Sequence, residues 1–452
     1  MTMRWALLAG VMLGVAYTLS PLTVLCLALL IAVTRWAGRD LTGRERERFV
    51  ALVTLAIVLR LALIAGLFLF ADPSKPYATF FGDEEIFKSR PIWLRNIGLG
   101  VPISAADFIY ALDETGMSGH LYVLAYLQAL VGDAPYGAHV FNAAVYVTSV
   151  LLLYRLVRPS FGRPAAMGGL VVLLFLPSLF SWSVSVLKEP FYALLAVFEL
   201  ICVLALARAP QWRHKVLAIA GIVLLAVALE SIRKGSLLIV SIGTVAGLAA
   251  AITVRRPRLL LAAAVVIPLV AMMAMTRPFV QSRIRSVAIA GARYHAGHVV
   301  TPGISYRILD PRYYTDWNSM PGMSNREVAL FITRALTSYF IEPLPSSVQS
   351  RALWAYLPEQ LVWLLLLALV PFGIRHGLKR DPTLTCILLA HACGVILVVA
   401  LNSGNVGTLI RHRGLSLPYT VWLSGLGGAA VVARVHQRSS AVIEGTRTHG
   451  DR

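Results

Sequence analysis

The chain has 452 residues, of which 58% are hydrophobic and 14% charged, and its formal net charge is +19. A soluble protein of this size could not bury that much apolar surface, and apolar runs of roughly 17–25 residues, the length that crosses a bilayer, recur along it. Positive charge in such a protein points to cytoplasmic loops and anionic lipids before nucleic acid. We therefore expect an all-α polytopic membrane protein whose partners include membrane lipids and exclude nucleic acid.

The apolar runs, taken in chain order, predict about eleven or twelve spanning helices. Residues 4–34 are interrupted by Ser20-Pro21 and are expected to form a short hairpin of two helices, or else one long helix. Ten further spans are expected at about 49–71, 137–157, 164–183, 190–208, 215–232, 235–254, 258–276, 359–374, 381–401 and 416–433. The apolar segment 119–132 is shorter and is expected to be a helix on the outer membrane surface.

Basic clusters between the runs set the orientation. Arginines gather at 35–48, 155–163, 255–258 and 375–380, and placing every such cluster in the cytoplasm gives one consistent alternation. The expected organisation is an N-terminal transmembrane module at 1–276 with a first outer loop at 72–136, a long outer loop at 277–358, C-terminal transmembrane helices at 359–434 and a disordered cytoplasmic tail at 435–452.

The first outer loop contains FFGDEEIF at residues 80–87, which places Asp83, Glu84 and Glu85 side by side. Taken singly, Glu84 and Glu85 are expected to be solvated. Asp83 is the candidate for function, because aromatic neighbours hold it near the apolar boundary, where a raised pKa suits a general base. Carboxylates at such a place can also bind Mg²⁺ or Mn²⁺, the one cofactor that the sequence suggests.

A second acid lies in SVSVLKEPFYALL at residues 183–195, where Lys188 and Glu189 occupy a short turn between two spans. This turn lies in the same outer plane as Asp83, so the two carboxylates can converge on one site. Asp83 and Glu189 are then the expected metal ligands. Lys188 and Arg233, at neighbouring outer turns, are expected to contact a phosphate group.

A third element is NSGNVGTLIRHRG at residues 402–414, with Arg411, His412 and Arg413 beside the membrane on the outer side. The preference of positive residues for the cytoplasmic side does not explain arginines on the outer side. Binding of an anion at headgroup level does explain them, because guanidinium groups bind phosphate in a bidentate manner. Asn405 and Gly407 are expected to shape the loop around that phosphate.

Two other groups of residues stand out. Arg60 and Glu199 lie within apolar runs and are expected to form a structural pair. The long outer loop offers Tyr306, Tyr313 and Trp317, whose flat faces suit stacking on sugars.

These residues together resemble the GT-C superfamily of polytopic glycosyltransferases. The resemblance runs from about residue 49 to 208: a span leading to GDEE, the segment GHLYVLAYLQALVG, a span ending in LLLYRLVRPSFG, and the outer LKEP; the tail NVGTLIRHRGLSLPYTVWLSGLG adds to it. It implies transfer of a sugar from a polyprenyl-phosphate donor to a glycan, lipid or protein acceptor, at the periplasmic face of a bacterial inner membrane.

Carried over to this chain, the resemblance makes Asp83 the acid that deprotonates or orients the acceptor hydroxyl, with Glu84 beside it. Glu189 becomes the second-loop acid, and Arg411 and Arg413 stabilise the departing lipid phosphate. The chain departs from the family pattern in two ways. The second acid is Glu where Asp is commoner, and the chain lacks the large soluble C-terminal domain of many members.

Other functions remain open from the sequence. An O-antigen ligase or polymerase would use Arg293, His295 and Arg307 of the long outer loop and would not need Asp83. A transporter or flippase would show an inverted repeat, broken mid-membrane helices and a charged central cavity, whereas the sequence shows no repeat and its polar groups cluster at one face. A non-catalytic assembly factor of the same fold is the third alternative.

Overall fold

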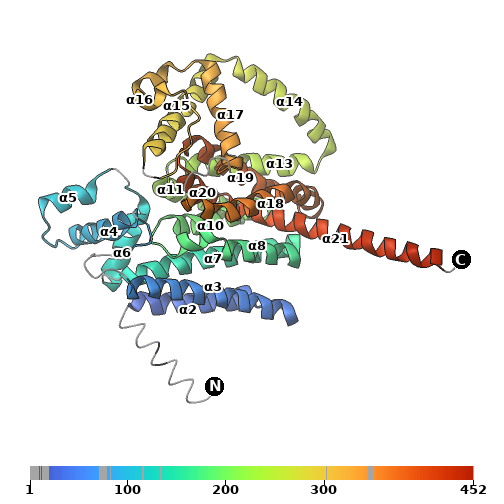
Figure 1. Cartoon of the computed structure of the whole chain (residues 1–452), viewed down its shortest axis with the longest axis horizontal. Coiled ribbons are helices and arrows are strands. Elements are labelled where there is room, and N and C mark those ends of the chain that lie inside the picture. Colours follow the sequence, from blue (N-terminus) through green and yellow to red (C-terminus); the bar gives the residue numbers. More distant parts are fainter. Residues whose placement is uncertain are drawn as a thin grey trace. The chain divides into compact units, whose positions relative to one another are not determined.

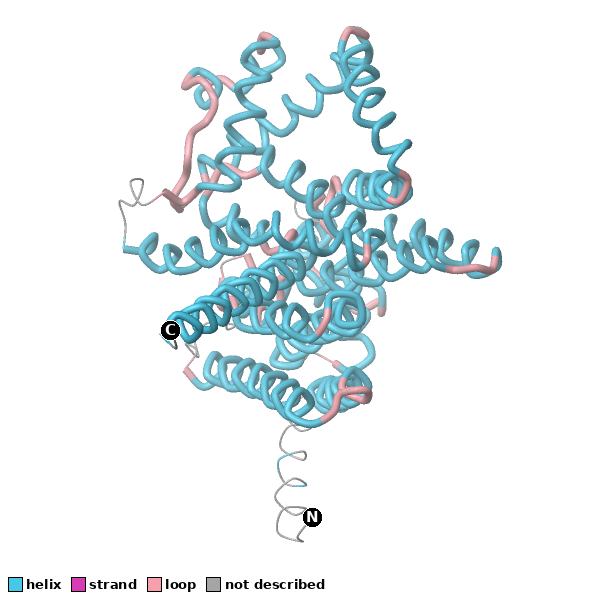
Figure 2. The backbone as a smooth tube through the Cα atoms, turned by 90° about the vertical axis from the view of Figure 1, so that its right-hand side faces the viewer, coloured by secondary structure: helices cyan, strands magenta, loops and turns pink. Residues whose placement is uncertain are grey.

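The computed structural model describes residues 10, 12, 20–70, 79–81, 83–114, 117–132, 135–301, 303–344 and 351–450. Regular structure within these ranges is helical (Figure 2). Their one β-type pairing is an isolated bridge between Ser305 and Asn405. The prediction of an all-α polytopic bundle is confirmed.

Eight described helices are long and apolar enough to cross a membrane, or ten spans if each of two bent helix pairs counts as one. The bent pairs are 163–175 with 177–183, bent by 60°, and 406–413 with 417–437, bent by 68°. These ten correspond one for one to the ten spans predicted after residue 48. Of the predicted hairpin at 4–34, the second part is helix α2 (Pro21–Ala37), and most of residues 4–19 lies outside the described residues.

Contacts divide the chain into two compact units, one comprising 1–156 with 170–237 and the other 157–169 with 238–452. The helices of the first unit are α2, α3 (Gly43–Leu69), α4 (Glu84–Gly98), α5 (Ala105–Leu112), α6 (Gly119–Val131), most of α7 (Pro135–Phe161), the second half of α8 (Arg163–Phe175), α9 (Pro177–Ser183), α10 (Glu189–Arg208) and α11 (Trp212–Ile232). Helices α4, α5 and α6 gather at one end of this unit, between α3 and α7 in the chain (Figure 1).

Helix α6 fits the expectation of a surface helix at 119–132. It is too short to be a candidate span, and it has one buried and one exposed face. Leu121 and Leu124 are buried, whereas Tyr122 and Tyr126 are 54% and 66% exposed. This division between an inner and an outer face is typical of a helix that lies along a membrane surface.

Arg60 does not pair with Glu199 as predicted. Its three guanidinium nitrogens donate to Ser183 Oγ at 2.8 Å, Ala56 O at 3.1 Å and Leu174 O at 2.9 Å. The guanidinium carbon also lies 4.5 Å from the ring centroid of Phe180. Helix α8 ends before Pro177, and its terminal carbonyl groups lack helical partners, so a long donor side chain from α3 satisfies them.

The second unit contains the end of α7, the first half of α8, the last residues of α12 (Ser236–Ser241), η1 (Ile242–Ala246), α13 (Gly247–Val254), α14 (Pro257–Met275), α15 (Pro278–Val300), α16 (Arg312–Thr315), η2 (Trp317–Gly322), α17 (Asn325–Ile341), α18 (Arg351–Arg380), α19 (Pro382–Asn402), α20 (Val406–Arg413) and α21 (Leu417–Gly450). Helices α18 and α21 pack with their backbones in contact. A Cβ at Gly373 would lie 1.8 Å from Leu423 O, and one at Gly427 2.1 Å from Leu369 O. Close approach at small residues is how membrane helices commonly associate.

Two segments are more ordered than the sequence predicts. Residues 277–344, expected as a long loop, form helices around their own apolar core, in which Ala288, Ala292 and Ala296 face Phe331 and Ala335. The small residues at every fourth position of α15 give it a flat face on which α17 packs. Helix α21 continues to Gly450, where a disordered tail from 435 was expected, and no proline interrupts the chain after Pro418.

Candidate functional site around residues 184–187

Residues 184–187 connect α9 to α10 as buried, non-helical backbone. Polar backbone groups buried away from water need hydrogen-bond partners. The four residues cannot bond to one another in a helical pattern. The N–H groups of Ser185 and Leu187 find local partners, whereas the carbonyl oxygens bind side chains from other helices.

Three side chains of α6 and α7 bind the carbonyl oxygens of this segment. His139 Nδ1 lies 2.6 Å from Val184 O, and His120 Nε2 lies 3.4 Å from Val186 O. Asn142 donates to Ser185 O at 2.8 Å and to Leu187 O at 2.7 Å. All three side chains are fully buried. Because a carbonyl oxygen only accepts, each imidazole donates through the nitrogen that faces it.

Glu84 joins the first outer segment to residues 184–187. Its Oε1 accepts from the backbone N–H groups of Phe80 and Phe81, both at 2.9 Å, and its Oε2 accepts from Val186 N–H at 3.2 Å. Burial raises the pKa of the Glu84 carboxyl, while these N–H groups and the charge of Lys88 oppose the rise. The expectation that Glu84 is solvated is wrong, because it is completely buried.

The neighbours of Glu84 differ from it sharply. Asp83 and Glu85 are exposed, one just before α4 and the other in its first turn. Lys88, one turn further along α4, is 3% exposed, and burial lowers its pKa to about 8. In GDEE, the exposed carboxylates of Asp83 and Glu85 therefore flank the buried and hydrogen-bonded carboxylate of Glu84.

Glu189 begins α10, directly beyond the buried segment, and is 8% exposed. Its Oε1 lies 3.9 Å from Arg233 Nη1, and Lys188 Nζ donates to Ile232 O at 3.1 Å. Lys188 thus caps the last turn of α11. Lys188 and Arg233, the two cations of this unit predicted to contact phosphate, therefore already contact protein groups. The charge of Arg233 is partly neutralised by Glu189.

His120 also interacts electrostatically with the two charged residues that follow the segment. Burial lowers the pKa of His120 to about 4, the charge of Glu189 opposes this shift and that of Lys188 adds to it. Glu84, the neighbour of the predicted first-loop acid Asp83, binds Val186, and the predicted second-loop acid Glu189 follows three residues later; convergence of Asp83 and Glu189 on one site stays a prediction. The described residues include no group of three His, Cys, Asp or Glu side chains placed to hold a metal, and binding of a divalent cation by Asp83 and Glu189 stays a prediction.

Arg413 is not placed to bind a phosphate as predicted. It is 4% exposed, and its nitrogens donate to the carbonyl oxygens of Ser338, Tyr339 and Glu342 and to Gln360 Oε1. These carbonyl groups belong to the end of α17, where helical partners are lacking. Arg413 satisfies that helix end, and its guanidinium is fully engaged within the second unit.

Arg411 and His412 lie on the same short helix and are half-buried. The His412 ring is 6.4 Å from that of His298, whose Nδ1 lies 2.6 Å from Asn402 O. Asn405 caps α20 by accepting from the N–H groups of Gly407 and Thr408, so its role is to begin this helix. Phosphate binding by Arg411 and His412 stays a prediction.

The three aromatic residues predicted to stack on sugars occupy different environments. Trp317 is 40% exposed and keeps a face toward solvent. Tyr313 is 1% exposed, with its hydroxyl donating to Glu327 at 3.0 Å, so it cannot serve as a stacking surface. Tyr306 is half-buried, and its hydroxyl donates to Ser403 O at 2.8 Å.

The sequence interpretation did not single out His120, His139 or Asn142. The spacing of His139 and Asn142 places them on one face of a helix that is otherwise apolar. Polar residues inside an apolar run are expensive unless they serve a purpose. That pattern could have identified the pair, although not the segment they bind.

Replacing Glu84 by Gln tests the role of its carboxylate. The amide group of Gln has only one acceptor oxygen, so the N–H groups of Phe80 and Phe81, or that of Val186, lose their partner. We expect the free energy of unfolding to fall by about 1–3 kcal/mol, the cost of leaving a buried donor unsatisfied. Chemical unfolding in detergent measures this, with Glu85→Gln as the matched exposed control. Equal stability of the two variants would contradict the assigned role.

His120 should make stability depend on pH. Its pKa is about 4 in the folded chain and 6.5 as a free side chain, so between these values the unfolded state binds the extra proton. This contribution to stability is fully present above pH 6.5 and is lost as the pH falls through 4, with a total of about 3 kcal/mol. His120→Gln keeps a donor for Val186 O without the titration. Unfolding midpoints over that range should vary less in the variant; parallel curves would refute the assignment.

Comparisons of the chain with protein-family models, with curated proteins and with solved structures found no match.

Proposed function

We propose that this chain is an integral membrane glycosyltransferase that moves a sugar from a polyprenyl-phosphate donor to a glycan, lipid or protein acceptor. The reaction would take place at the periplasmic face of a bacterial inner membrane and would serve cell-envelope polysaccharide synthesis. The observation that carries the proposal is the pairing of exposed Asp83 with buried Glu84, whose three backbone N–H bonds fix the start of α4. A carboxylate held on a rigid support at a loop boundary is what general-base catalysis requires.

The proposed chemistry needs one proton acceptor and one leaving group. Asp83 takes the proton of the acceptor hydroxyl while the hydroxyl oxygen forms a bond to the anomeric carbon of the sugar. The bond between that carbon and the phosphate oxygen breaks, and its electron pair leaves with the lipid phosphate. Glu84 acts as a positioning residue, because it touches backbone and not substrate.

The departing phosphate needs positive charge beside it. In the first unit, Arg233 is the candidate, since its side chain keeps 17% exposure while it contacts Glu189. Glu189 then orients Arg233, as an acid commonly does for a phosphate-binding guanidinium. Arg411, the other arginine expected to contact the phosphate, belongs to the second unit, and its role stays a prediction. A divalent cation held by Asp83 and Glu189 would supply the same charge compensation.

One observation weighs against the ligase or polymerase alternative. His295, the histidine that this alternative would use, is completely buried, with Nδ1 at 2.5 Å from Ser403 O and Nε2 at 3.1 Å from Tyr314 OH. An imidazole with both nitrogens engaged in a core is placed to support structure, not to act on a substrate. Arg293 and Arg307 are exposed and do not by themselves form a site.

The proposal is tested by purifying the chain into lipid nanodiscs with a panel of polyprenyl-phosphate sugars and membrane-extracted acceptors. Mass spectrometry follows loss of the lipid-linked sugar and the appearance of free polyprenyl phosphate. Consumption of one donor, dependent on acceptor, is the expected result. Binding of donors without any bond cleavage would instead favour a transporter or an assembly factor.

A further inference from the structure

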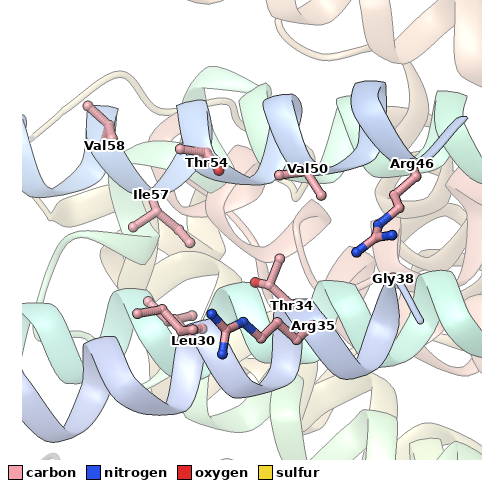
Figure 3. A pocket seen from close by; sticks show the side chains of 10 residues that line it. Leu30, Thr34, Arg35, Gly38, Arg46, Val50, Thr54, Ile57 and Val58 are labelled. Carbon is pink, nitrogen blue, oxygen red and sulfur yellow. The ribbon is translucent and has the colours of Figure 1, made fainter. Parts of the chain in front are cut away.

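A groove between α2 and α3 combines a long apolar wall with positive charge at one end. It encloses about 450 Å³ and is lined by residues of both helices (Figure 3). Leu30 forms part of its buried floor, and Ile57 faces it from α3. Arg35 and Arg46 line it from opposite helices. Neither the acids nor the histidines of the candidate site belong to this groove.

The lining residues follow one face of each helix. On α3 they are Arg46, Val50, Thr54 and Val58, which recur at every fourth position and so lie in a row. From Arg46 to Val58 this row covers about 18 Å along the helix axis. Val50 and Val58 are 42% and 53% exposed, so the groove opens to the surroundings of the helices, which for α3 is the bilayer.

Two polar features of the groove indicate that it binds a ligand. Arg35 and Arg46 are exposed and form no ion pair with another described residue, whereas the nearby Asp40 is already paired with Arg39 and Arg155. Thr34 Oγ1 is a buried hydroxyl oxygen with no hydrogen-bond partner among the described residues. Figure 3 shows Thr34 and Arg46 pointing into the space between the helices.

We infer that this groove binds an anionic glycerophospholipid. The headgroup phosphate lies between Arg35 and Arg46, an ester oxygen of the glycerol accepts from Thr34 Oγ1, and an acyl chain follows the row from Val50 to Val58. A guanidinium group can donate two parallel hydrogen bonds to a phosphate. The Thr34 hydroxyl can donate one hydrogen bond to an ester oxygen next to that phosphate. Basic pockets between transmembrane helices are typical sites for anionic headgroups.

Two other occupants fit the groove less well. A polyprenyl phosphate has the charge and the apolar tail, but it has no carboxylic ester that could accept from Thr34 Oγ1. Residues 1–19 of the chain are apolar enough to cover the groove, but they contain Arg4 and no acidic residue, so they cannot neutralise Arg35 and Arg46.

The inference is tested on the purified full-length chain by native mass spectrometry with phosphatidylglycerol as the probe. The double variant Arg35→Gln/Arg46→Gln should weaken its binding about tenfold or more, as expected for losing two charged contacts to one phosphate. The matched control is Arg44→Gln/Arg48→Gln, which removes the same charge from the same region outside the groove. This control should bind as wild type does.

Further arms separate the rival occupants. Thr34→Val keeps the shape and all charges, and it should weaken phosphatidylglycerol about threefold, the loss of one neutral hydrogen bond. Phosphatidylcholine and inorganic phosphate should bind more weakly than phosphatidylglycerol. The inference fails if both double variants lose binding equally, if polyprenyl phosphate binds better, or if a photoreactive residue placed at Val58 crosslinks to residues 1–19 in native membranes.

Discussion

Asp83→Asn should reduce donor consumption by about 10²–10⁴-fold, the range that a positioned general base contributes. The amide cannot accept the proton of the acceptor hydroxyl, while the size of the side chain hardly changes. Asp83 is exposed and lies outside the buried contacts of Glu84, so the variant should fold as wild type does. The measurement is the initial rate of loss of the lipid-linked sugar at saturating acceptor.

Glu85→Gln is the matched control for this experiment. It removes a carboxylate just two residues away, also exposed, and it should keep the wild-type rate. Equal rates for Asp83→Asn and the wild type would transfer the chemistry elsewhere in the chain. In that case the next variants to measure are Arg293→Gln and Arg307→Gln, because the ligase alternative requires both arginines for activity.

Arg413→Gln should cause the largest loss of stability among the predicted variants, about 3 kcal/mol or more. A shorter side chain leaves the terminal carbonyl groups of α17 buried without donors, and each such group costs about 1–3 kcal/mol. The variant also loses the guanidinium contacts with the rings of Tyr339 and Trp363, at 5.5 and 5.4 Å. Unfolding of the purified chain by denaturant in detergent measures the difference.

Arg411→Gln is the control, since Arg411 shares the helix and the charge but is half-buried. Its stability should stay close to that of the wild type. If Arg413→Gln proves as stable as Arg411→Gln and instead weakens donor binding, the phosphate-binding role first expected for Arg413 would be restored.

The sequence predicts the spans well because a membrane-spanning helix requires an apolar run of characteristic length, which can be recognised directly in the sequence. All ten apolar runs after residue 48 correspond to helices or bent helix pairs. The bends within two of these spans were harder to predict from the sequence, although Pro177 lies at one of them. The long segment 277–344 was mistaken for a loop because its helices pack through small residues, whose weak hydrophobicity hides the periodicity.

The site was harder to predict, since sequence position says little about which charged side chains are buried. Asp83, Glu84 and Glu85 are adjacent acids, yet one is fully buried and its neighbours are exposed. That difference arises from the N–H groups of distant residues such as Val186, which no local pattern reveals. Likewise, Arg413 has its partners at the end of α17, about seventy positions earlier in the chain.

The order of residues around 184–187 has a consequence for biosynthesis. The described side chains on α4, α6 and α7 that hydrogen-bond to this segment all precede it in the chain. A nascent protein emerges from its N-terminus onward, so these donors and acceptors are already made when the irregular backbone reaches the membrane. The segment can therefore be delivered directly to its partners, without a period in which its polar groups face lipid. Reversing that order by circular permutation would expose it during insertion, when no completed neighbour could receive it.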